Sequence, residues 1–446
     1  MNSHHKHQSG DSVVGPIILD PLRALSSSEI LVPGSKSHSN REILMSLFAE
    51  GTSGLRGLLV SEDTRWGLDA CTRLGGAVDG SRDAVRVTGI GRRRPVSQGS
   101  VYVGSAGTLA RFLPGFLAAG DSGTWTLEAS EQMSARPMTE LIRSLRGAGA
   151  RIDDAGRGAF PFEVWGDTLR GDDVALSGET SSQFISGLLL AAPLARRPMT
   201  IRVQDGIVQS DYVRLTIQRM LDRGVSIEAA QDLSEFRVRP SAYRALDVLI
   251  EADASTATYF SALPAILGGS ITLKNLPARS YQPDLGFLDI LQRMGCVVDR
   301  GEQVTIRRDP ERPLAGGFSL DMRALSDSAL TVAAVAVFAD APITIHGIEH
   351  IRHHECDRIS VACEMLTRLG VKIEERRDGL VVHPGTPRFG VIDSHDDHRI
   401  AMSMSLVALG GAGAEVLDPA SVRKTCPDFF SMIATLGASI RPGGAA

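Results

Sequence analysis

A phrase that recurs six times is the feature of this sequence that most limits how the chain can fold. Each copy is a helix-like stretch, a glycine, and then a short apolar segment typical of a strand. The glycines are Gly75, Gly149, Gly224, Gly295, Gly370 and Gly437. Successive positions differ by 74, 75, 71, 75 and 67 residues. Because a glycine just past a helix is the usual left-handed cap, the pattern predicts six helices that each end and lead into a strand.

A second series of segments alternates with the first. In these segments a helix rich in small residues gives way to a turn and a strand, and they begin at Leu47, Leu117, Leu194, Ile266, Phe338 and Leu409. Two helices and several strands form a unit that cannot bury its apolar face alone. The sequence therefore predicts an α/β protein in which six such units pack together.

The first helices of the six units begin with charged residues as well as capping residues. Each opens with Ser, Thr or Asp, the residue types that cap helix N-termini. Ordinary capping does not explain the other polar side chains in these first turns, which are Lys36, Arg41, Arg111, Gln183, His398 and Arg399. A helix N-terminus presents free N–H groups and the positive end of its dipole. Several of them aimed at one cleft would form a site for a polyanion.

The charge balance and the cysteines exclude several classes of protein. With 47 Lys and Arg against 52 Asp and Glu, the net charge of −5 provides no overall positive field for nucleic acid. No apolar run is long enough for a membrane span, and the first residues lack the apolar core of a signal peptide, so we expect a cytoplasmic protein. Five scattered cysteines without a C-x-x-C pair indicate free thiols. His4, His5 and His7 could bind a metal, but we expect residues 1–16 to be a disordered tail.

Lysine is rare in this chain. Only five of the 47 basic residues are lysine, namely Lys6, Lys36, Lys274, Lys372 and Lys424. A chain that otherwise uses arginine, yet has lysine in P-G-S-K-S and in R-K-T-C-P-D, indicates a need for the compact, titratable ammonium at those places. Lys36 and Lys424 are therefore the first candidate site residues, and we expect the other three at the surface.

The segment IRHHECDRIS, residues 351–360, places two imidazoles, two carboxylates and two guanidinium groups close together. Such crowding can adjust His354 or Glu355 for proton transfer near neutral pH. Metal binding by His353, His354 and Glu355 is an alternative, but neighbouring residues point in different directions and no H-E-x-x-H spacing is present. The pattern favours acid–base chemistry, and for Asp357 a solvated charge run remains an equal alternative.

Eight motifs resemble the EPSP synthase family of enolpyruvyl transferases. They extend from about Ile30 to Gly437 and read L-V-P-G-S-K-S-H-S-N-R, G-S-A-G-T-L-A-R, A-R-P-M, S-S-Q-F, D-A-S-T-A-T-Y-F, H-E-C-D-R, D-D-H-R-I-A-M and K-T-C-P-D-F-F. The resemblance implies an α/β fold of two domains, an inside-out α/β barrel clamp with three βαβαββ repeats per domain. We expect one domain at residues 34–249 and the other at residues 17–33 plus 250–446.

The resemblance also implies the reaction. It is that of a 3-phosphoshikimate 1-carboxyvinyltransferase of the shikimate pathway, which serves chorismate and aromatic amino-acid biosynthesis. The enolpyruvyl group of phosphoenolpyruvate moves to the 5-hydroxyl of shikimate 3-phosphate, and phosphate is released. No metal or organic cofactor takes part. We expect a monomer whose partners are these two small molecules, with neither a nucleic-acid nor a membrane partner.

Site roles follow from the resemblance, position by position. Asp327 would be the base for the 5-hydroxyl, while Glu355 and Lys36 would serve the proton transfers at the methylene carbon, and His354 completes the catalytic group. The phosphoenolpyruvate set comprises Lys36, Gly107, Arg136, Arg358, Arg399 and Lys424. The shikimate 3-phosphate set comprises Lys36, Ser37, Arg41, Ser181, Ser182, Gln183, Ser210, Tyr212, Asp327, His350 and His354.

The sequence departs from the family pattern mainly on the acceptor side. His354 stands where many members have Lys, His350 where Asn is common, and Gln209 replaces a phosphate-binding Ser, with Ser210 one place later. Exchanging Lys for His replaces a permanent charge by one that titrates, so we expect acceptor binding to weaken as the pH rises above the pKa of His354.

These departures leave two alternatives open. The chain could be an enolpyruvyl transferase with another phosphorylated acceptor, or an inactive anion-binding paralogue. The chain retains the charged residues of the site, which speaks against the inactive paralogue; they are Lys36, Asp327, Glu355 and Lys424. The related cell-wall enzyme that uses UDP-N-acetylglucosamine has a reactive Cys loop, whereas this chain has no Cys between Cys71 and Cys296.

Overall fold

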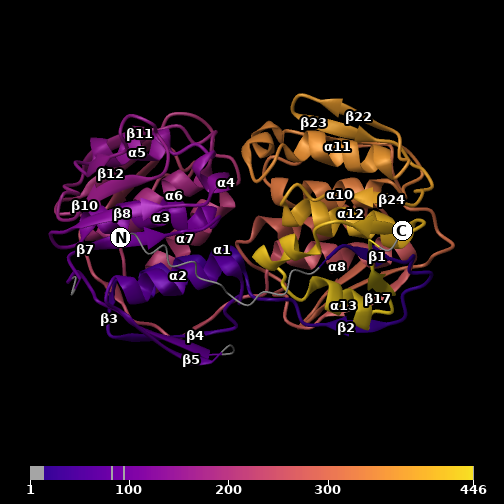
Figure 1. Cartoon of the computed structure of the whole chain (residues 1–446), viewed down its shortest axis with the longest axis horizontal. Helices are drawn as coiled ribbons and strands as arrows, with labels where there is room; N and C mark the ends of the chain where they lie inside the picture. Colours follow the sequence, from indigo (N-terminus) through magenta and orange to yellow (C-terminus); the bar gives the residue numbers. More distant parts are fainter. Residues whose placement is uncertain (1–14, 82–83, 94–95, 445–446) are drawn as a thin grey trace.

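The computed structural model describes residues 15–81, 84–93 and 96–444 and shows two lobes side by side (Figure 1). The first half runs from helix α1 to strand β16, and the second half contains β1, β2 and everything from α8 to β26. His4, His5 and His7, and with them most of the predicted tail at 1–16, lie outside the described residues.

One repeat illustrates the unit. It contains β7 (Gln98–Tyr102), α3 (Gly107–Ala119), β8 (Thr124–Glu128), α4 (Glu131–Ser134), α5 (Thr139–Gly147), β9 (Arg151–Asp153) and β10 (Phe162–Trp165). β7 pairs in parallel with β8, whereas β10 lies antiparallel between β8 and β9. Six four-stranded sheets with this order occur in the described part of the chain. The predicted α/β fold of six βαβαββ repeats is confirmed.

The remaining elements follow the same scheme. First helices of the units are α1 (Lys36–Leu47), α6 (Ser182–Ala191), α8 (Ala254–Leu267), α10 (Ala329–Ala336) and α12 (His398–Gly410). Second helices are α2 (Glu62–Arg73), α7 (Asp211–Asp222), α9 (Phe287–Arg293), α11 (Arg358–Arg368) and α13 (Phe429–Thr435). Short 3-10 turns are η1 (Ala192–Leu194), η2 (Pro283–Gly286), η3 (Ser326–Ser328), η4 (Glu349–His353) and η5 (Pro419–Lys424).

The strands of the other five sheets take equivalent places. The first and second strands, which are parallel, are β16 (Val248–Leu249) with β4 (Thr52–Arg56), β11 (Asp172–Leu176) with β12 (Met199–Val203), β2 (Ser28–Ile30) with β17 (Gly269–Leu273), β20 (Ser319–Asp321) with β21 (Ile343–His346), and β24 (Gly390–Ile392) with β25 (Ala414–Val416). The third and fourth are β6 (Ala84–Thr88) with β5 (Ala77–Ser81), β14 (Glu235–Val238) with β13 (Ile227–Ala229), β19 (Val304–Arg308) with β18 (Val297–Arg300), β23 (Gly379–Val382) with β22 (Ile373–Arg376), and β1 (Ile17–Leu19) with β26 (Ile440–Pro442). The two-residue strands β3 (Ala49–Glu50) and β15 (Tyr243–Arg244) form a separate pair.

The six repeat glycines end their helices as predicted. They follow α2, α5, α7, α9, α11 and α13, and all have φ between 79° and 103°. This left-handed conformation is accessible to glycine without a steric penalty. Local chemistry therefore sets the boundary between helix and strand in every repeat.

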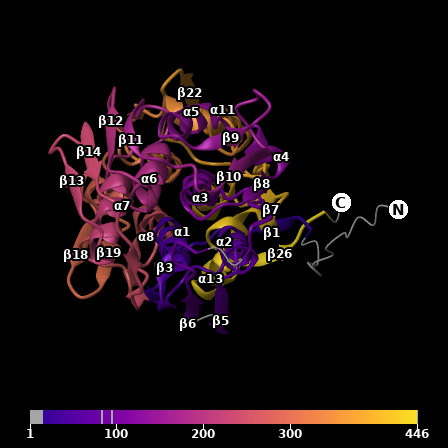
Figure 2. The same cartoon turned by 90° about the vertical axis from the view of Figure 1, so that its left-hand side faces the viewer.

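The first helices lie inside and the sheets outside. Helices α3 and α6 are buried along nearly their whole length and have strands around them in the end-on view (Figure 2). Each half has an apolar core of its own, one drawn from residues 43–250 and the other from residues 19–32 and 252–438. This arrangement directs the beginnings of the first helices toward the space between the halves.

The chain crosses between the halves twice, and the crossing segments hydrogen-bond to each other. Ser35 N donates to Glu251 O at 2.8 Å, and Asp253 N donates to Pro33 O at 2.8 Å. Near the N-terminus, β1 lies between β25 and β26 in the sixth sheet. The domain boundaries near residues 34 and 250 stay a prediction, which these pairings support.

Four of the six first helices begin as the capping pattern predicts. Ser35, Ser181, Asp253 and Asp397 each accept a hydrogen bond from a backbone N–H of the first turn. Helices α3 and α10 differ, because α3 begins after Ala106 without a side-chain cap and the 3-10 turn η3 leads into α10.

Candidate active site

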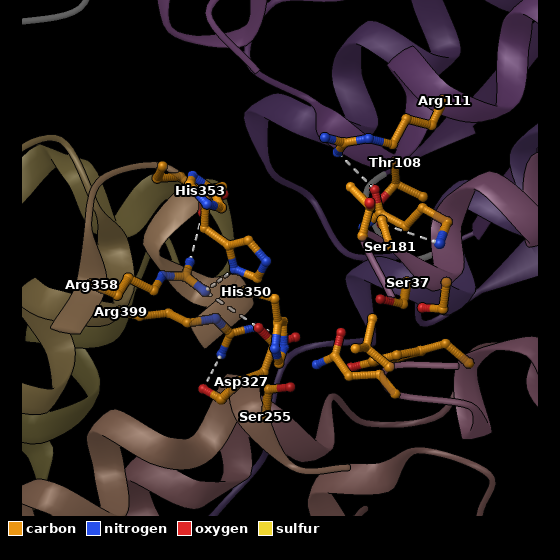
Figure 3. A pocket seen from close by; sticks show the side chains of 18 of the residues that line it. Ser37, Thr108, Arg111, Ser181, Ser255, Asp327, His350, His353, Arg358 and Arg399 are labelled. Carbon is orange, nitrogen blue, oxygen red and sulfur yellow. Dashed lines mark hydrogen bonds and ion pairs between the residues drawn. The ribbon is translucent and has the colours of Figure 1, made fainter. Parts of the chain in front are cut away.

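A cavity of about 510 Å³ lies between the two halves. Ser37, Thr108, Arg111 and Ser181 of the first half face Asp327, His350, His353, Arg358 and Arg399 of the second half across it (Figure 3). Seven Lys and Arg side chains line the cavity together with six Asp and Glu side chains. Fixed positive groups of this kind suit phosphorylated small molecules.

The structure brings most of the predicted site residues into this cavity. Those that line it are Lys36, Ser37, Arg41, Arg136, Ser181, Ser182, Gln183, Tyr212, Asp327, His350, His354, Glu355, Arg358 and Arg399. They come from both halves and from all parts of the chain, so only folding and contact between the halves assemble them.

Three predicted residues do not line the cavity. Lys424 lies behind Glu355, with Nζ 2.9 Å from Oε1. Gly107 is the first residue of α3, where an added Cβ would come within 2.8 Å of Arg136 Nη1. Ser210 precedes α7, and Gln209, with a positive φ of 51°, lines the cavity instead. That Ser210 contacts the acceptor stays a prediction.

Glu355 is held by three cations. Its Oε2 lies 2.7 Å from Arg358 Nη2, and its Oε1 lies 2.9 Å from Lys424 Nζ and 3.8 Å from Arg136 Nη1. Burial by itself raises the pKa of Glu355, but the charges of Lys424, Arg358 and Arg136 outweigh it and hold the pKa well below its ordinary value. Glu355 is therefore ionised at neutral pH.

Asp327, in the turn η3, stands between two arginines. Its Oδ2 lies 3.1 Å from Arg399 Nη2 and its Oδ1 lies 3.4 Å from Arg358 Nη1. Burial favours the neutral acid, but the charges of Arg399 and Arg358 prevail and lower the pKa of Asp327 to about 2. An anion that bound the two arginines would offset their charge and raise the proton affinity of this carboxylate.

Lys36 begins α1 and lies at the cavity with its Nζ 3.7 Å from Asp63 Oδ2. Burial lowers the pKa of this ammonium, Asp63 opposes the change, and Lys424 adds to it. A lowered pKa makes an ammonium a better proton donor near neutral pH. The backbone N–H of Lys36 donates to Asp253 Oδ2 at 3.0 Å, which fixes the start of the helix.

A hydrogen bond to Arg358 determines which ring nitrogen of His354 carries the proton. Its Nδ1 lies 2.9 Å from Arg358 Nη1, and because a guanidinium only donates, Nδ1 accepts and the ring proton is on Nε2. Burial and the charge of Arg358 hold the pKa of His354 well below its ordinary value, and burial also lowers that of His350. His354 is therefore neutral at pH 7 in the free protein, and its titration when the acceptor binds stays a prediction.

Arg41 is fixed by the protein itself. It is 2% exposed, and its Nε, Nη1 and Nη2 donate to Thr216 Oγ1, Ser37 O and Tyr212 O at 2.8, 2.8 and 3.1 Å. These bonds hold Ser37 and Tyr212 beside each other in the cavity wall. The predicted contact of Arg41 with an acceptor carboxylate stays a prediction.

Several lining residues were not assigned from the sequence. They are Thr108, Arg111, Gln209, Asp253, Ser255, His353 and His398. Arg111 and His398 belong to the charged first turns noted above, and Arg111 Nη1 donates to Gln183 Oε1 at 2.9 Å. Asp253 was detectable as a cap, since its Oδ1 accepts from Thr256 N at 2.8 Å. The resemblance had placed Gln209 where the family has a phosphate-binding Ser and Ser255 within the motif D-A-S-T-A-T-Y-F, but neither was assigned a contact.

Within the described ranges, no group of three or more His, Cys, Asp or Glu side chains is arranged to hold a metal ion. The same residues contain no helix that is both long and apolar enough to cross a membrane.

Comparison with known proteins decides between the enolpyruvyl transferases. The family model for EPSP synthase (3-phosphoshikimate 1-carboxyvinyltransferase) matches residues 23–433. The chain belongs to the EPSP synthase family. It is 46% identical over 430 residues to 3-phosphoshikimate 1-carboxyvinyltransferase 2 of Halalkalibacterium halodurans, covering 96% of each chain. It is 35% identical over 425 residues to the enzyme of that name from Trichormus variabilis, covering 94% of this chain and 98% of the relative.

A solved member of the EPSP synthase family has the same fold. The structure of EPSP synthase from Acinetobacter baumannii superimposes with a TM-score of 0.79 at 25% identity, covering 96% of this chain and 99% of that one. The similarity extends over both halves.

Proposed function

We propose that this chain transfers the enolpyruvyl group of phosphoenolpyruvate to the 5-hydroxyl of shikimate 3-phosphate, and that the cavity between the halves is where it does so. The observation that carries the assignment of residues is the position of Asp327 between Arg358 and Arg399, with Glu355 bound to the same Arg358. Two carboxylates that share a guanidinium lie close enough to serve one pair of reacting molecules.

Phosphoenolpyruvate would bind among the cations. Arg136, Arg358 and Arg399 line the cavity, and fixed guanidinium groups bind phosphate and carboxylate through paired N–H donors. The uncapped start of α3, next to Arg136, adds backbone N–H groups and the positive end of a helix dipole. Lys424 does not reach the cavity itself and would act through Glu355.

The proton transfers follow from the pKa directions. Lys36, whose pKa is lowered by burial, donates a proton to the methylene carbon while the acceptor oxygen bonds to the neighbouring carbon. Asp327 takes the proton of the 5-hydroxyl once the bound phosphate has offset Arg358 and Arg399. Loss of phosphate and of a methyl proton from the tetrahedral adduct then restores the double bond. Glu355, which is ionised, accepts that proton.

The opposite wall would hold the acceptor. Ser181 and Ser182 begin α6 and line the cavity, where hydroxyl and backbone donors suit a phosphate. Gln183 and Tyr212 lie beside them. That a monomer is active stays a prediction.

A phosphate-release assay tests the proposal. We expect turnover with phosphoenolpyruvate and shikimate 3-phosphate, and at least about 10²-fold less with unphosphorylated shikimate, because the donors for the phosphate would be left unpaired. UDP-N-acetylglucosamine serves as the control acceptor. Turnover with a different phosphorylated alcohol alone would assign the chain to another acceptor, and no turnover with any acceptor would identify an inactive paralogue.

A further inference from the structure

Asp284 is a buried carboxylate next to the cavity to which no role has yet been given. It lies in the turn η2 of the second half and is 2% exposed. Its Oδ2 accepts hydrogen bonds from the Ser255 hydroxyl and, at 3.4 Å, from the Tyr212 hydroxyl. Its Oδ1 is also buried and has no hydrogen-bond partner among the residues that the structure describes.

The contact with Tyr212 joins the two halves. Tyr212 is on α7 of the first half and Asp284 is in the second, and Tyr212 and Ser255 both line the cavity. The Tyr212 side is rigid, because Tyr212 O accepts from Arg41 Nη2 at 3.1 Å and from Thr216 Oγ1 at 2.8 Å. Asp284 therefore holds one wall residue from each half at a fixed distance.

A charged carboxylate is energetically unfavourable at this buried position. Burial raises the pKa of Asp284, Asp327 and Asp253 add to the effect, and although Arg399 opposes it the pKa reaches about 6. A carboxylate that desolvation and two like charges destabilise is not explained by stability alone. One oxygen of Asp284 accepts hydrogen bonds from both Ser255 and Tyr212, which indicates that the carboxylate serves to position these two residues of the cavity wall.

We propose that Asp284 is a positioning residue that holds the Tyr212 hydroxyl across the interface between the halves and so forms the acceptor side of the cavity when the halves are together. This inference rests on the proposed function, because that function places the acceptor beside Tyr212. Asp284 itself does not touch the reacting atoms. We call the contact the Tyr212–Asp284 latch.

Direct binding of shikimate 3-phosphate, measured by calorimetry, tests the latch. We expect Tyr212→Phe and Asp284→Leu each to weaken binding about 10- to 150-fold, the size of one hydrogen bond to a charged group. Because the two residues act through one contact, the double variant should bind no more than about twofold more weakly than the weaker single variant. Asp284→Asn should keep most of the affinity that Asp284→Leu loses, because the amide carbonyl oxygen can accept hydrogen bonds from both hydroxyl groups.

The matched control is Glu251→Gln. Glu251 Oε2 also accepts from two side chains, Ser280 and Gln282, but both partners belong to the same half and Glu251 does not line the cavity. We expect its affinity for the acceptor to be unchanged. In the latch variants the KM for phosphoenolpyruvate should change less than twofold, which a general loss of structure would not allow.

The outcomes separate this inference from the proposed function. If the wild-type protein neither binds nor turns over shikimate 3-phosphate, the proposed function fails. If the wild type binds it but Tyr212→Phe binds within twofold of wild type, or the two single effects multiply in the double variant, the latch is wrong. Tyr212→Phe retains the ring and should fold, so it decides the question even if Asp284→Leu does not.

Discussion

Lys424 Nζ lies 2.9 Å from Glu355 Oε1, so the last 3-10 turn of the chain is fixed directly behind a carboxylate of the cavity. Both side chains are at least nine-tenths buried. A buried pair of this kind loses much more when one partner is removed than the pair contributes as a whole. Glu355 and Lys424 are therefore expected to act as a unit.

Glu355→Gln should lower kcat by about 10²–10⁴-fold, because it removes a proton-accepting group. It also leaves Lys424, Arg358 and Arg136 without a shared counter-charge, which should reduce the free energy of unfolding by about 3–5 kcal/mol. Urea unfolding at pH 7 measures the second effect. Glu364→Gln, an exposed partner of Arg368 on α11, is the control and should change neither quantity. If Glu355→Gln were as stable as the wild type, then Lys424, Arg358 and Arg136 would not be paired with Glu355 in solution.

Lys36→Met should lower kcat by about 10²–10⁴-fold while the protein still folds, with a lower thermal midpoint because buried Asp63 loses its ion-pair partner. The ammonium is desolvated, as its lowered pKa indicates, and the backbone N–H that bonds to Asp253 is retained in the variant. Lys274→Met is the control, since Lys274 is an exposed lysine paired with Glu29. Collapse of the Lys36→Met fold would contradict the catalytic assignment and indicate a structural one.

Binding of the acceptor should be accompanied by uptake of a proton at His354. In the free protein the pKa of His354 is well below its ordinary value, and a phosphate dianion nearby would raise it. Affinity should therefore increase as the pH falls from about 8 to 6, around the ordinary His range. Calorimetry in buffers of different ionisation enthalpy measures the uptake. In His354→Lys the charge is permanent, so the pH dependence that remains is that of the ligand; equal uptake in both proteins would refute the role of His354.

Asp284→Asn should stabilise the protein at pH 7 and not at pH 4. The pKa of Asp284 in the folded state, about 6, is higher than its ordinary value of 3.8, so the charged form costs stability above pH 6. That cost is relieved as the pH falls from 6 to 3.8, and it amounts to roughly 2–3 kcal/mol. The charged and titratable groups facing Asp284 are Asp327, Asp253, Arg399 and Tyr212. Equal stabilisation at both pH values would show that Asp284 is not charged in the fold.

Gly34→Ala should destabilise the crossing between the halves. A Cβ on Gly34 would lie 1.9 Å from Gly57 O, and backbone cannot move aside as a side chain can. Overpacking of this kind costs about 1–3 kcal/mol, which chemical unfolding would detect. Gly206→Ala is the control because no atom lies within 4 Å of the added carbon. If both variants unfold alike, the crossing is less tightly packed than the structure indicates.

The repeat and its helix ends could be predicted from the sequence because their causes are local. A left-handed glycine such as Gly75 or Gly370 ends a helix through its own backbone freedom, and Ser181 or Asp397 begins one with its own side chain. The prediction failed at α3, where Ala106 precedes the helix without a cap. There the uncapped N–H groups lie next to Arg136, a hydrogen-bond donor that cannot replace a cap.

Much of the cavity could also be predicted, since the family motifs carry their residues in fixed local phrases. What could not be predicted depends on neighbours distant in sequence. Gln209, in a left-handed turn, lines the cavity rather than Ser210. The pKa of His354 is lowered by desolvation and by the guanidinium of Arg358, which act on it only in the folded chain.

The sequence by itself determined the number of repeats, the residue at which each second helix stops, and most of the polar groups available for chemistry. Only the tertiary structure decided which of these groups meet, which are charged, and that Asp284 and Tyr212, 72 residues apart, join the two halves. The physical reason is that φ preferences and capping act within a few residues, whereas desolvation and ion pairing act over a few ångströms in space and so depend on the whole fold.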